Sequence, residues 1–153
     1  MKRGTQKNSC ESILNKDIKE LLPHREPFLF IDKVILVEPG CVTASKYINK
    51  GEEYFRGHFP GKPLVPGVLI VESMAQTSGI ACASYCNELK DTGMYFLSRI
   101  SDMKFKYPVL PGDILIIKSE VMQRFDTFFK VHAACEVNGK VVAEGDLILT
   151  KRS

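Results

Sequence analysis

The order of hydrophobic and polar residues in the first third of the chain predicts a short helix and a pair of strands. Residues 15–22 (NKDIKELL) carry apolar side chains at helical spacing and stop at Pro23, as a short amphipathic helix does. The next two segments, residues 28–37 (FLFIDKVILV) and 41–50 (CVTASKYINK), are rich in β-forming residues. The turn-forming sequence Glu38-Pro39-Gly40 separates them, so we expect a strand pair.

A long segment in the middle of the chain would place apolar residues on nearly every side of a helix. Residues 68–90 (VLIVESMAQTSGIACASYCNELK) contain no proline, and this distribution is typical of a helix that is buried all round. A membrane span, which needs about eighteen apolar residues, is not expected, because polar side chains interrupt the run at Glu72, Ser73, Gln76, Thr77 and Ser78. We therefore expect a core helix covered by a sheet.

The last third of the chain is β-rich. Strand-like segments occur at residues 94–100, 102–109, 113–123, 127–137 and 141–150. The last two are joined by Asn138-Gly139, a dipeptide typical of a type I′ hairpin. These elements together predict an α+β fold in which an antiparallel sheet wraps around one long helix.

Composition and charge describe one ordinary domain and exclude few functions. With 153 residues, of which 44% are hydrophobic and 25% charged, the chain fits a single domain, residues 1–153. Its formal charge of +3 is too small to indicate nucleic acid as the main partner, although it is compatible with an acidic protein partner. The opening residues 1–12 are polar and lack the apolar segment of a secretion signal, so we expect a loose N-terminal tail.

The cysteines indicate a reducing, cytoplasmic environment. They are odd in number and scattered along the chain, at Cys10, Cys41, Cys82, Cys86 and Cys135. Such a pattern favours free thiols over a disulfide framework. Cys82 and Cys86 lie four residues apart, but no histidine or third cysteine stands at ligand spacing from them. We expect them to be core residues and expect no metal site.

The sequence GHFPGKPLVPGVLIVESMAQ, residues 57–76, combines a restricted backbone with chemically active side chains. An ordinary turn needs one glycine or proline, whereas this loop has Pro60, Gly61, Pro63, Pro66 and Gly67. The loop is therefore expected to hold a group in a fixed position. His58 lies at its start, and the helix that follows carries Glu72 at a position where a carboxylate would be buried.

These residues suit a proton-transfer reaction, although a histidine followed by a glutamate is also compatible with structural roles. The unperturbed pKa of histidine suits His58 as a general base, and burial would raise the pKa of Glu72 and make it a general acid. Gln76 shares the helix face of Glu72 and can hold the same water or substrate oxygen. The helix start at Pro66-Gly67 offers backbone N–H groups to an oxyanion. Together they could dehydrate a 3-hydroxyacyl thioester without a metal or redox cofactor.

Three separated segments resemble one enzyme family. They are LLPHREPFLFID at residues 21–32, the segment 57–76 quoted above, and KFKYPVLPGD at residues 104–113. Together they are similar to the 3-hydroxyacyl-acyl-carrier-protein dehydratases of type II fatty acid synthesis. The resemblance implies a hot-dog fold and the reversible dehydration of 3-hydroxyacyl-acyl-carrier-protein to the trans-2-enoyl form in fatty acid elongation. It also implies a homodimer with its sites at the subunit interface, which can assemble further into a trimer of dimers.

By the same resemblance, His58 and Glu72 are the catalytic pair, the Gly67 N–H binds the thioester oxygen, and Gln76 lies near the water held by Glu72. The related dehydratase-isomerases usually have aspartate at this helix position, so Glu72 favours the plain dehydratase. The chain departs from the family pattern at Leu64, Val65 and Ser73. These departures leave the preferred acyl chain length open.

Other residues have two possible roles each. His24 and His132 are expected to be structural, with His24 in a turn or at a subunit contact. Tyr95 is either a gate of the acyl tunnel, as the resemblance implies, or a core residue. Three cations form either a solvated strand face or a docking patch for the acidic acyl carrier protein: Arg99, Lys104 and Lys106.

Two other functions remain open at the level of the sequence. One is a hot-dog acyl thioesterase, which would act on the same thioesters but would not need the loop that carries His58. The other is a non-catalytic acyl-binding module of the kind that is fused to DNA-binding segments. The sequence shows no recognition helix and no second domain in support of that module.

Overall fold

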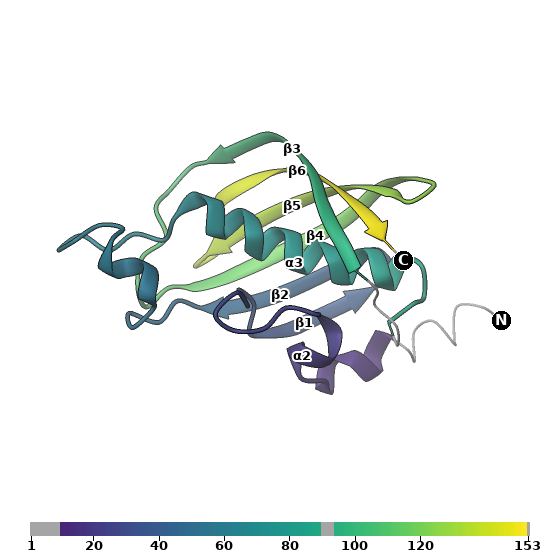
Figure 1. Cartoon of the computed structure of the whole chain (residues 1–153), viewed down its shortest axis with the longest axis horizontal. Coiled ribbons are helices and arrows are strands. Elements are labelled where there is room, and N and C mark those ends of the chain that lie inside the picture. Colours follow the sequence, from purple (N-terminus) through teal and green to yellow (C-terminus); the bar gives the residue numbers. More distant parts are fainter. Residues whose placement is uncertain (1–9, 90–93, 153) are drawn as a thin grey trace.

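A computed structural model describes residues 10–89 and 94–152, in which one antiparallel sheet curves around a long helix (Figure 1). The sheet has six strands in the order β1-β2-β4-β5-β6-β3, and every neighbouring pair is antiparallel. The strands are β1 (Lys33–Glu38), β2 (Cys41–Tyr47), β3 (Met94–Phe105), β4 (Ile114–Phe125), β5 (Phe128–Val137) and β6 (Lys140–Arg152). This is the α+β architecture that the sequence predicts.

The long helix α3 (Gly67–Tyr85) lies against the concave face of the sheet and is the centre of the core. Its side chains are buried on nearly every side from Ile70 to Ser84, as its apolar composition predicts. It packs mainly against β4 and β2. Fully buried residues from the sheet complete the core, among them Val42, Ile117, Phe129, Leu147 and Leu149. In the described part of the chain no helix is long and apolar enough to cross a membrane.

The N-terminal region differs from the prediction in two respects. The expected helix at residues 15–22 is a 3₁₀ turn, η1 (Ile13–Asn15), followed by a short helix α2 (Ile18–Leu21). The break occurs because Asp17 caps α2, with its Oδ1 accepting a hydrogen bond of 2.9 Å from the Lys19 N–H. The prediction of a loose N-terminal tail is wrong for residues 10–12, because these residues are helical and Cys10 is buried in the core. Residues 1–9 lie outside the described part.

The first strand begins later than expected. Residues 28–32 do not belong to β1, because α3 binds their backbone through a side chain. The Phe30 N–H donates to Gln76 Oε1 at 2.9 Å, and Gln76 Nε2 donates to the Phe28 carbonyl at 3.1 Å. This segment therefore runs from the sheet across α3 and is fastened to it.

The strand β3 is continuous, whereas the sequence predicts two strands with a break near residue 101. In place of a break, the pairing of β3 with β6 has two register shifts. One lies between Leu97 and Arg99, and the other lies between Ser101 and Lys104. Asp102 within the second has a positive φ of 54°. The predicted hairpin between β5 and β6 is confirmed, with φ of 52° at Asn138 and 77° at Gly139, as a type I′ turn requires.

Candidate active site

The loop before α3 holds the backbone of His58 on both sides. The His58 N–H donates to the Tyr54 carbonyl at 3.0 Å, and the His58 carbonyl accepts from the Leu64 N–H at 3.0 Å. Between them, Phe59 and Lys62 exchange two backbone hydrogen bonds around Gly61, whose φ is +76°. The concentration of proline and glycine thus has the effect that the sequence predicts, because it fixes the histidine at the base of a tight loop.

The side chain of His58 is oriented by the same loop. Its Nδ1 lies 2.8 Å from the Leu64 carbonyl oxygen, and its ring stacks on Phe59 with centroids 4.1 Å apart. Since a carbonyl oxygen can only accept, Nδ1 carries the hydrogen. In the neutral ring Nε2 is then left with a free lone pair, which is the state that a general base requires.

The N-terminus of α3 is open to a ligand. The helix begins at Gly67, as predicted, and its N-cap Pro66 provides no capping side chain. The N–H groups of Leu69 and Ile70 donate to the Pro66 carbonyl at 3.0 and 3.2 Å, whereas those of Gly67 and Val68 have no hydrogen-bond partner among the described residues and remain available to an oxyanion. A groove at this end is lined by Leu64, Val65, Gly67, Ile70 and residues 105–109. A Cβ on Gly67 would lie 3.1 Å from the Phe105 ring, so glycine permits the close approach of β3.

Glu72 and Gln76 form one connected pair on α3. Gln76 Nε2 donates to Glu72 Oε1 at 3.1 Å, as their spacing of one helical turn allows. Because the Gln76 amide also bonds the backbone of residues 28 and 30, its orientation is fixed and its nitrogen faces Glu72. Gln76 is only 1% exposed, whereas the Glu72 side chain is 20% exposed. The sequence predicts a buried carboxylate at Glu72. Within one chain, however, its side chain is only partly buried and reaches the surface.

His24 also reaches this pair, which sequence reasoning missed. Its Nε2 lies 3.7 Å from Glu72 Oε1, and its Nδ1 is buried without a hydrogen-bond partner among the described residues. The two residues are 48 positions apart in the sequence, so no local pattern connects them. The only signal was the occurrence of His24 in the first of the three segments that carry the family resemblance.

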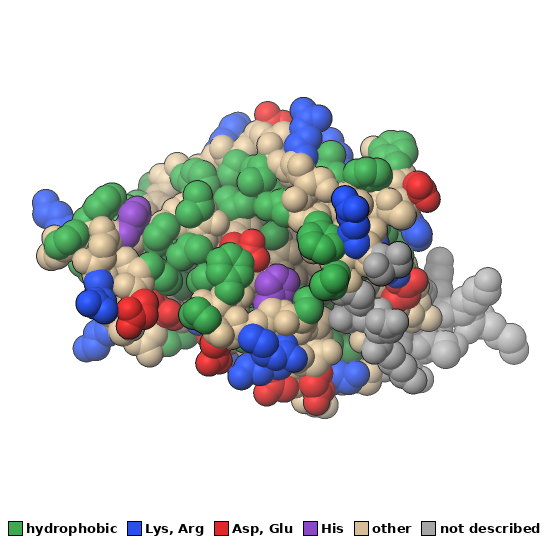
Figure 2. Space-filling view, in the orientation of Figure 1, with side chains coloured by type: hydrophobic (Ala, Val, Ile, Leu, Met, Phe, Trp, Pro, Cys, Tyr) green, Lys and Arg blue, Asp and Glu red, His purple; other side chains and the backbone are tan. Residues whose placement is uncertain are grey.

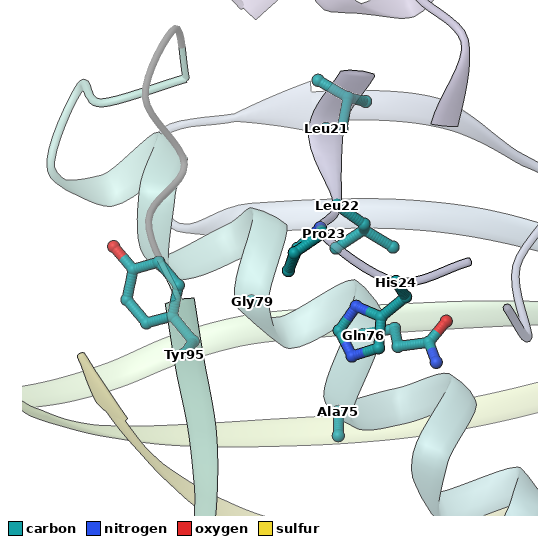
Figure 3. Close-up of a pocket in the computed structure, with 8 residues that line it drawn as sticks. All are labelled: Leu21, Leu22, Pro23, His24, Ala75, Gln76, Gly79 and Tyr95. Atoms are coloured by element: carbon teal, nitrogen blue, oxygen red, sulfur yellow. The ribbon is translucent and has the colours of Figure 1, made fainter. Parts of the chain in front are cut away.

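Tyr95 lines a small cavity together with His24 and Gln76 (Figure 3). Its ring packs edge-on against Phe129, and its Cβ would lie 3.8 Å from a Cβ on Gly79. Its hydroxyl is buried without a partner among the described residues, and burial raises its pKa. Tyr95 is therefore packed against the core and borders a cavity at the same time, so the geometry accommodates both predicted roles.

The three predicted docking cations have different surroundings. Lys106 Nζ lies 2.7 Å from Glu144 Oε1, and this hydrogen bond lowers the pKa of the Glu144 carboxyl. Lys104 stands opposite the same glutamate on β6. Arg99 instead stands opposite Ile148, and it forms no ion pair within residues 10–89 and 94–152. Lys104 also forms no ion pair among the described residues, but its charge contributes to lowering the pKa of the Glu144 carboxyl, so Arg99 is the cation of the three that does not stand opposite or pair with an acidic residue of β6.

No hydrogen bond or ion pair in the described part of one chain connects His58 with Glu72. His58 lies in the loop before α3, where its Nδ1 is bound to Leu64, while Glu72 lies five residues into α3 beside Gln76 and His24. Within one chain the two predicted catalytic residues therefore lie apart, and each has its own set of contacts.

Comparisons with known proteins place the chain in a family. A family model described as "FabA-like domain" matches residues 22–146. A protein of Ruminiclostridium cellulolyticum named 3-hydroxyacyl-[acyl-carrier-protein] dehydratase FabZ is 46% identical over 136 residues, covering 88% of this chain and 94% of the relative. A FabZ of Thiobacillus denitrificans is 41% identical over 139 residues, covering 90% of this chain and 96% of the relative. The chain belongs to the FabA-like family of 3-hydroxyacyl-acyl-carrier-protein dehydratases.

Solved structures are similar in fold. A chain of the dehydratase heterocomplex ApeI:P from Xenorhabdus doucetiae superposes with a TM-score of 0.77 at 16% identity, covering 90% of this chain and 92% of that chain. A hypothetical thioesterase with coenzyme A from Streptococcus pneumoniae superposes with a TM-score of 0.62 at 12% identity, covering 98% of both chains. At these identities the likeness concerns the fold alone, and it confirms the hot-dog architecture.

Proposed function

We propose that this protein dehydrates 3-hydroxyacyl-acyl-carrier-protein reversibly to the trans-2-enoyl form in fatty acid elongation, with His58 as base and Glu72 as acid. The observation that carries the assignment of His58 is the hydrogen bond between its Nδ1 and the Leu64 carbonyl, because this bond leaves Nε2 free to take a proton. Membership of the dehydratase family supports the reaction. We also propose a cytoplasmic location, which the free thiols of all five cysteines support.

The reaction divides between the two groups as follows. His58 Nε2 takes the proton from the carbon next to the thioester carbonyl, and negative charge builds up on the carbonyl oxygen. The Gly67 N–H at the start of α3 stabilises that charge; a donor of this kind is worth roughly 2.7 to 4 kcal/mol in comparable sites. The bond between the neighbouring carbon and its hydroxyl then breaks, and Glu72 gives its proton to the departing hydroxyl, which leaves as water. Glu72 ends as a carboxylate that accepts from Gln76.

We propose that a second copy of the chain completes the site along β3. This strand is an edge of the sheet, and within residues 10–89 and 94–152 its one partner strand is β6. Three of its apolar side chains stand opposite buried β6 residues, and so face the concave side, yet they are exposed: Leu97 by 38%, Ile100 by 48% and Phe105 by 53%. Figure 2 shows hydrophobic side chains gathered on this face of the molecule. An exposed apolar edge strand is suited to pairing with an identical strand across a two-fold axis.

The geometry of β3 explains how such a homodimer would share its sites. The end of β3 lies against the start of α3, where the Phe105 ring approaches Gly67. A partner that pairs along β3 would therefore lie next to the first turns of α3, whose Val68 is 75% exposed. We propose that this contact brings His58 of one subunit to Glu72 of the other. Such dimers can assemble further into a trimer of dimers.

We propose that the acyl carrier protein docks on an outer basic patch, which comprises Arg99, Lys130, Phe96 and Phe128. Lys130 and Arg99 stand opposite the same residue of β6, Ile148, and the next row outward contains Phe128 and Phe96. Residues in register share a face of the sheet, so the four side chains lie together on its convex side. The two phenylalanines are 47% and 46% exposed. Exposed cations around aromatic side chains suit an acidic protein surface.

The activity is tested directly with a 3-hydroxyacyl thioester and the matching trans-2-enoyl thioester. We expect the protein to interconvert the two in both directions, followed by the ultraviolet absorbance of the enoyl product and by mass spectrometry for the loss of water. A thiol reagent in a parallel sample detects hydrolysis. Release of free thiol without formation of enoyl product would indicate a thioesterase and contradict the proposal.

A further inference from the structure

His24 is held firmly although it lies in a turn. The turn follows α2, and Arg25 fastens it by donating through Nη1 to two carbonyl oxygens, that of Leu22 at 2.9 Å and that of His24 at 2.7 Å. The preceding Pro23 further restricts the backbone. Figure 3 shows the imidazole beside the Gln76 amide, while the Tyr95 hydroxyl points away from it. The position of the imidazole is therefore a built feature of the fold.

Two nitrogen atoms face the same oxygen of Glu72. Gln76 Nε2 lies 3.1 Å from Oε1, and His24 Nε2 lies 3.7 Å from Oε1. No described residue forms a hydrogen bond or ion pair with Oε2. The two oxygens of the carboxyl group thus differ in their surroundings.

The cavity beside His24 determines which ring nitrogen carries the hydrogen. Nδ1 is buried and has no partner in the described part of the chain. The residues that line the cavity around it are mostly apolar, including Leu21, Leu22, Ala75 and Gly79. A hydrogen on Nδ1 would be buried and unpaired, at a cost of about 1–3 kcal/mol, whereas a hydrogen on Nε2 points toward a carboxyl oxygen. The neutral ring is therefore the Nε2–H tautomer.

We propose that His24 is a positioning residue for the catalytic acid: its Nε2–H donates to Glu72 Oε1, so that the proton given to the leaving hydroxyl is carried by Oε2. This inference rests on the proposed function. In the acid form Oε1 is a carbonyl oxygen that accepts from Gln76 and His24, and Oε2 carries the hydrogen. When Oε2 passes its proton to the hydroxyl, water leaves and both electrons of the O–H bond stay on the carboxylate.

His24 is expected to lower the activation free energy of the chemical step rather than to strengthen substrate binding. Negative charge on Glu72 is absent at the start and develops as the hydroxyl departs, so a donor to Oε1 strengthens during the reaction. A distance of 3.7 Å is long for a hydrogen bond, but catalytic hydrogen bonds are often long without substrate and shorten in the complex. Loss of His24 should therefore lower kcat and leave KM nearly unchanged.

The test compares His24→Ala and His24→Gln, with His132→Gln as the matched control. A glutamine side chain can place its Nε2 donor near the position of the histidine Nε2. His132 also pairs with a carboxylate, Asp146 at 2.9 Å, but lies on β5 and is 45% exposed. We expect kcat to fall about 10-fold in His24→Ala, less than the ~10²-fold typical of a fully aligned donor. His24→Gln should recover part of the loss, and His132→Gln should behave as wild type.

Two measurements separate this role from a merely structural one. Added imidazole should restore part of the kcat of His24→Ala, because it can enter the space that the substitution leaves and donate to Glu72. In ¹⁵N spectra of the wild-type protein, Nδ1 of His24 should be the nitrogen without hydrogen. Unchanged kcat in His24→Ala or the opposite tautomer would overturn the inference and leave the dehydratase function intact. A wild-type protein that does not dehydrate the substrate would overturn both.

Discussion

His58 and Leu64 are joined by a hydrogen bond of 2.8 Å between the imidazole Nδ1 and the backbone carbonyl. The bond spans the tight loop at Gly61 and connects the imidazole to the chain that leads into α3. It fixes the orientation and the tautomer of the ring together. The loop therefore orients the proposed base as well as leading the chain into α3.

This bond leads to a prediction for two substitutions of His58. His58→Asn can retain a donor near the position of Nδ1 and hence the contact with Leu64, whereas His58→Ala loses it. Both lack a base, so turnover should fall about 100-fold or more in each. In thermal unfolding, the Tm of His58→Asn should be closer to that of the wild type than the Tm of His58→Ala is. Near-normal turnover by either variant would exclude His58 as the base.

A second prediction concerns the Gln76 amide. Gln76→Leu removes three hydrogen bonds and leaves the buried Phe30 N–H without its acceptor, which should lower the free energy of unfolding by about 1–3 kcal/mol. Turnover should also fall, because Glu72 loses a donor. Ser73→Ala is the control on the same helix, since its hydroxyl bonds only the Leu69 carbonyl in the preceding turn. Equal unfolding curves for the two variants would show that Gln76 does not fasten residues 28–30.

The third prediction tests β3 as the subunit interface. Ile100→Lys places a charge on this edge strand and should convert the dimer into monomers with little activity, measured by native mass spectrometry and by turnover. Ile35→Lys is the control at the opposite edge of the sheet, where β1 presents a side chain of similar exposure, 46% against 48%. Dissociation by Ile35→Lys and not by Ile100→Lys would assign the dimer to β1 instead.

The fourth prediction separates Arg99 on β3 from Lys106, which directly follows this strand. Arg99→Glu should raise the KM for carrier-bound substrate and leave turnover of a small thioester analogue unchanged, and added salt should act in the same direction. Lys106→Glu should have the smaller effect, because Glu144 already offsets the charge of Lys106. Equal salt sensitivity of the two substrates would mean that Arg99 belongs to a solvated strand face.

The sequence predicted the order of the elements, because the periodicity of apolar residues is a local property. It predicted α3 from its lack of interruption and the β5–β6 hairpin from Asn138-Gly139, and both are present. It misplaced the start of β1, because the backbone at residues 28–30 is bound by Gln76, 46 or 48 positions away. Such a contact depends on packing between distant segments and has no local signal.

The same distinction applies to the candidate site. The glycines and prolines around His58 marked the loop, since a restricted backbone is visible in the sequence. The pairing of His24 with Glu72 was not predictable from spacing, because it needs the turn after α2 to lie over α3. The neutralisation of Lys106 by Glu144 likewise arises only when β3 and β6 are aligned in register.

The central claim is that one chain supplies the base and another the acid of each site. The variants His58→Ala and Glu72→Gln are each expected to be inactive, so they can be unfolded together and refolded as a mixture. Random pairing makes about half of the dimers mixed, and in each mixed dimer one of the two sites receives an intact His58 and an intact Glu72.

The recovered activity of this mixture is the most direct measurement, with native mass spectrometry to confirm that mixed dimers have formed. Sites shared between subunits predict recovery to about a quarter of the wild-type activity, because one quarter of all sites are complete. Sites built within single chains predict no recovery, since every site then lacks one group. Confirmed mixed dimers without activity would contradict the shared site.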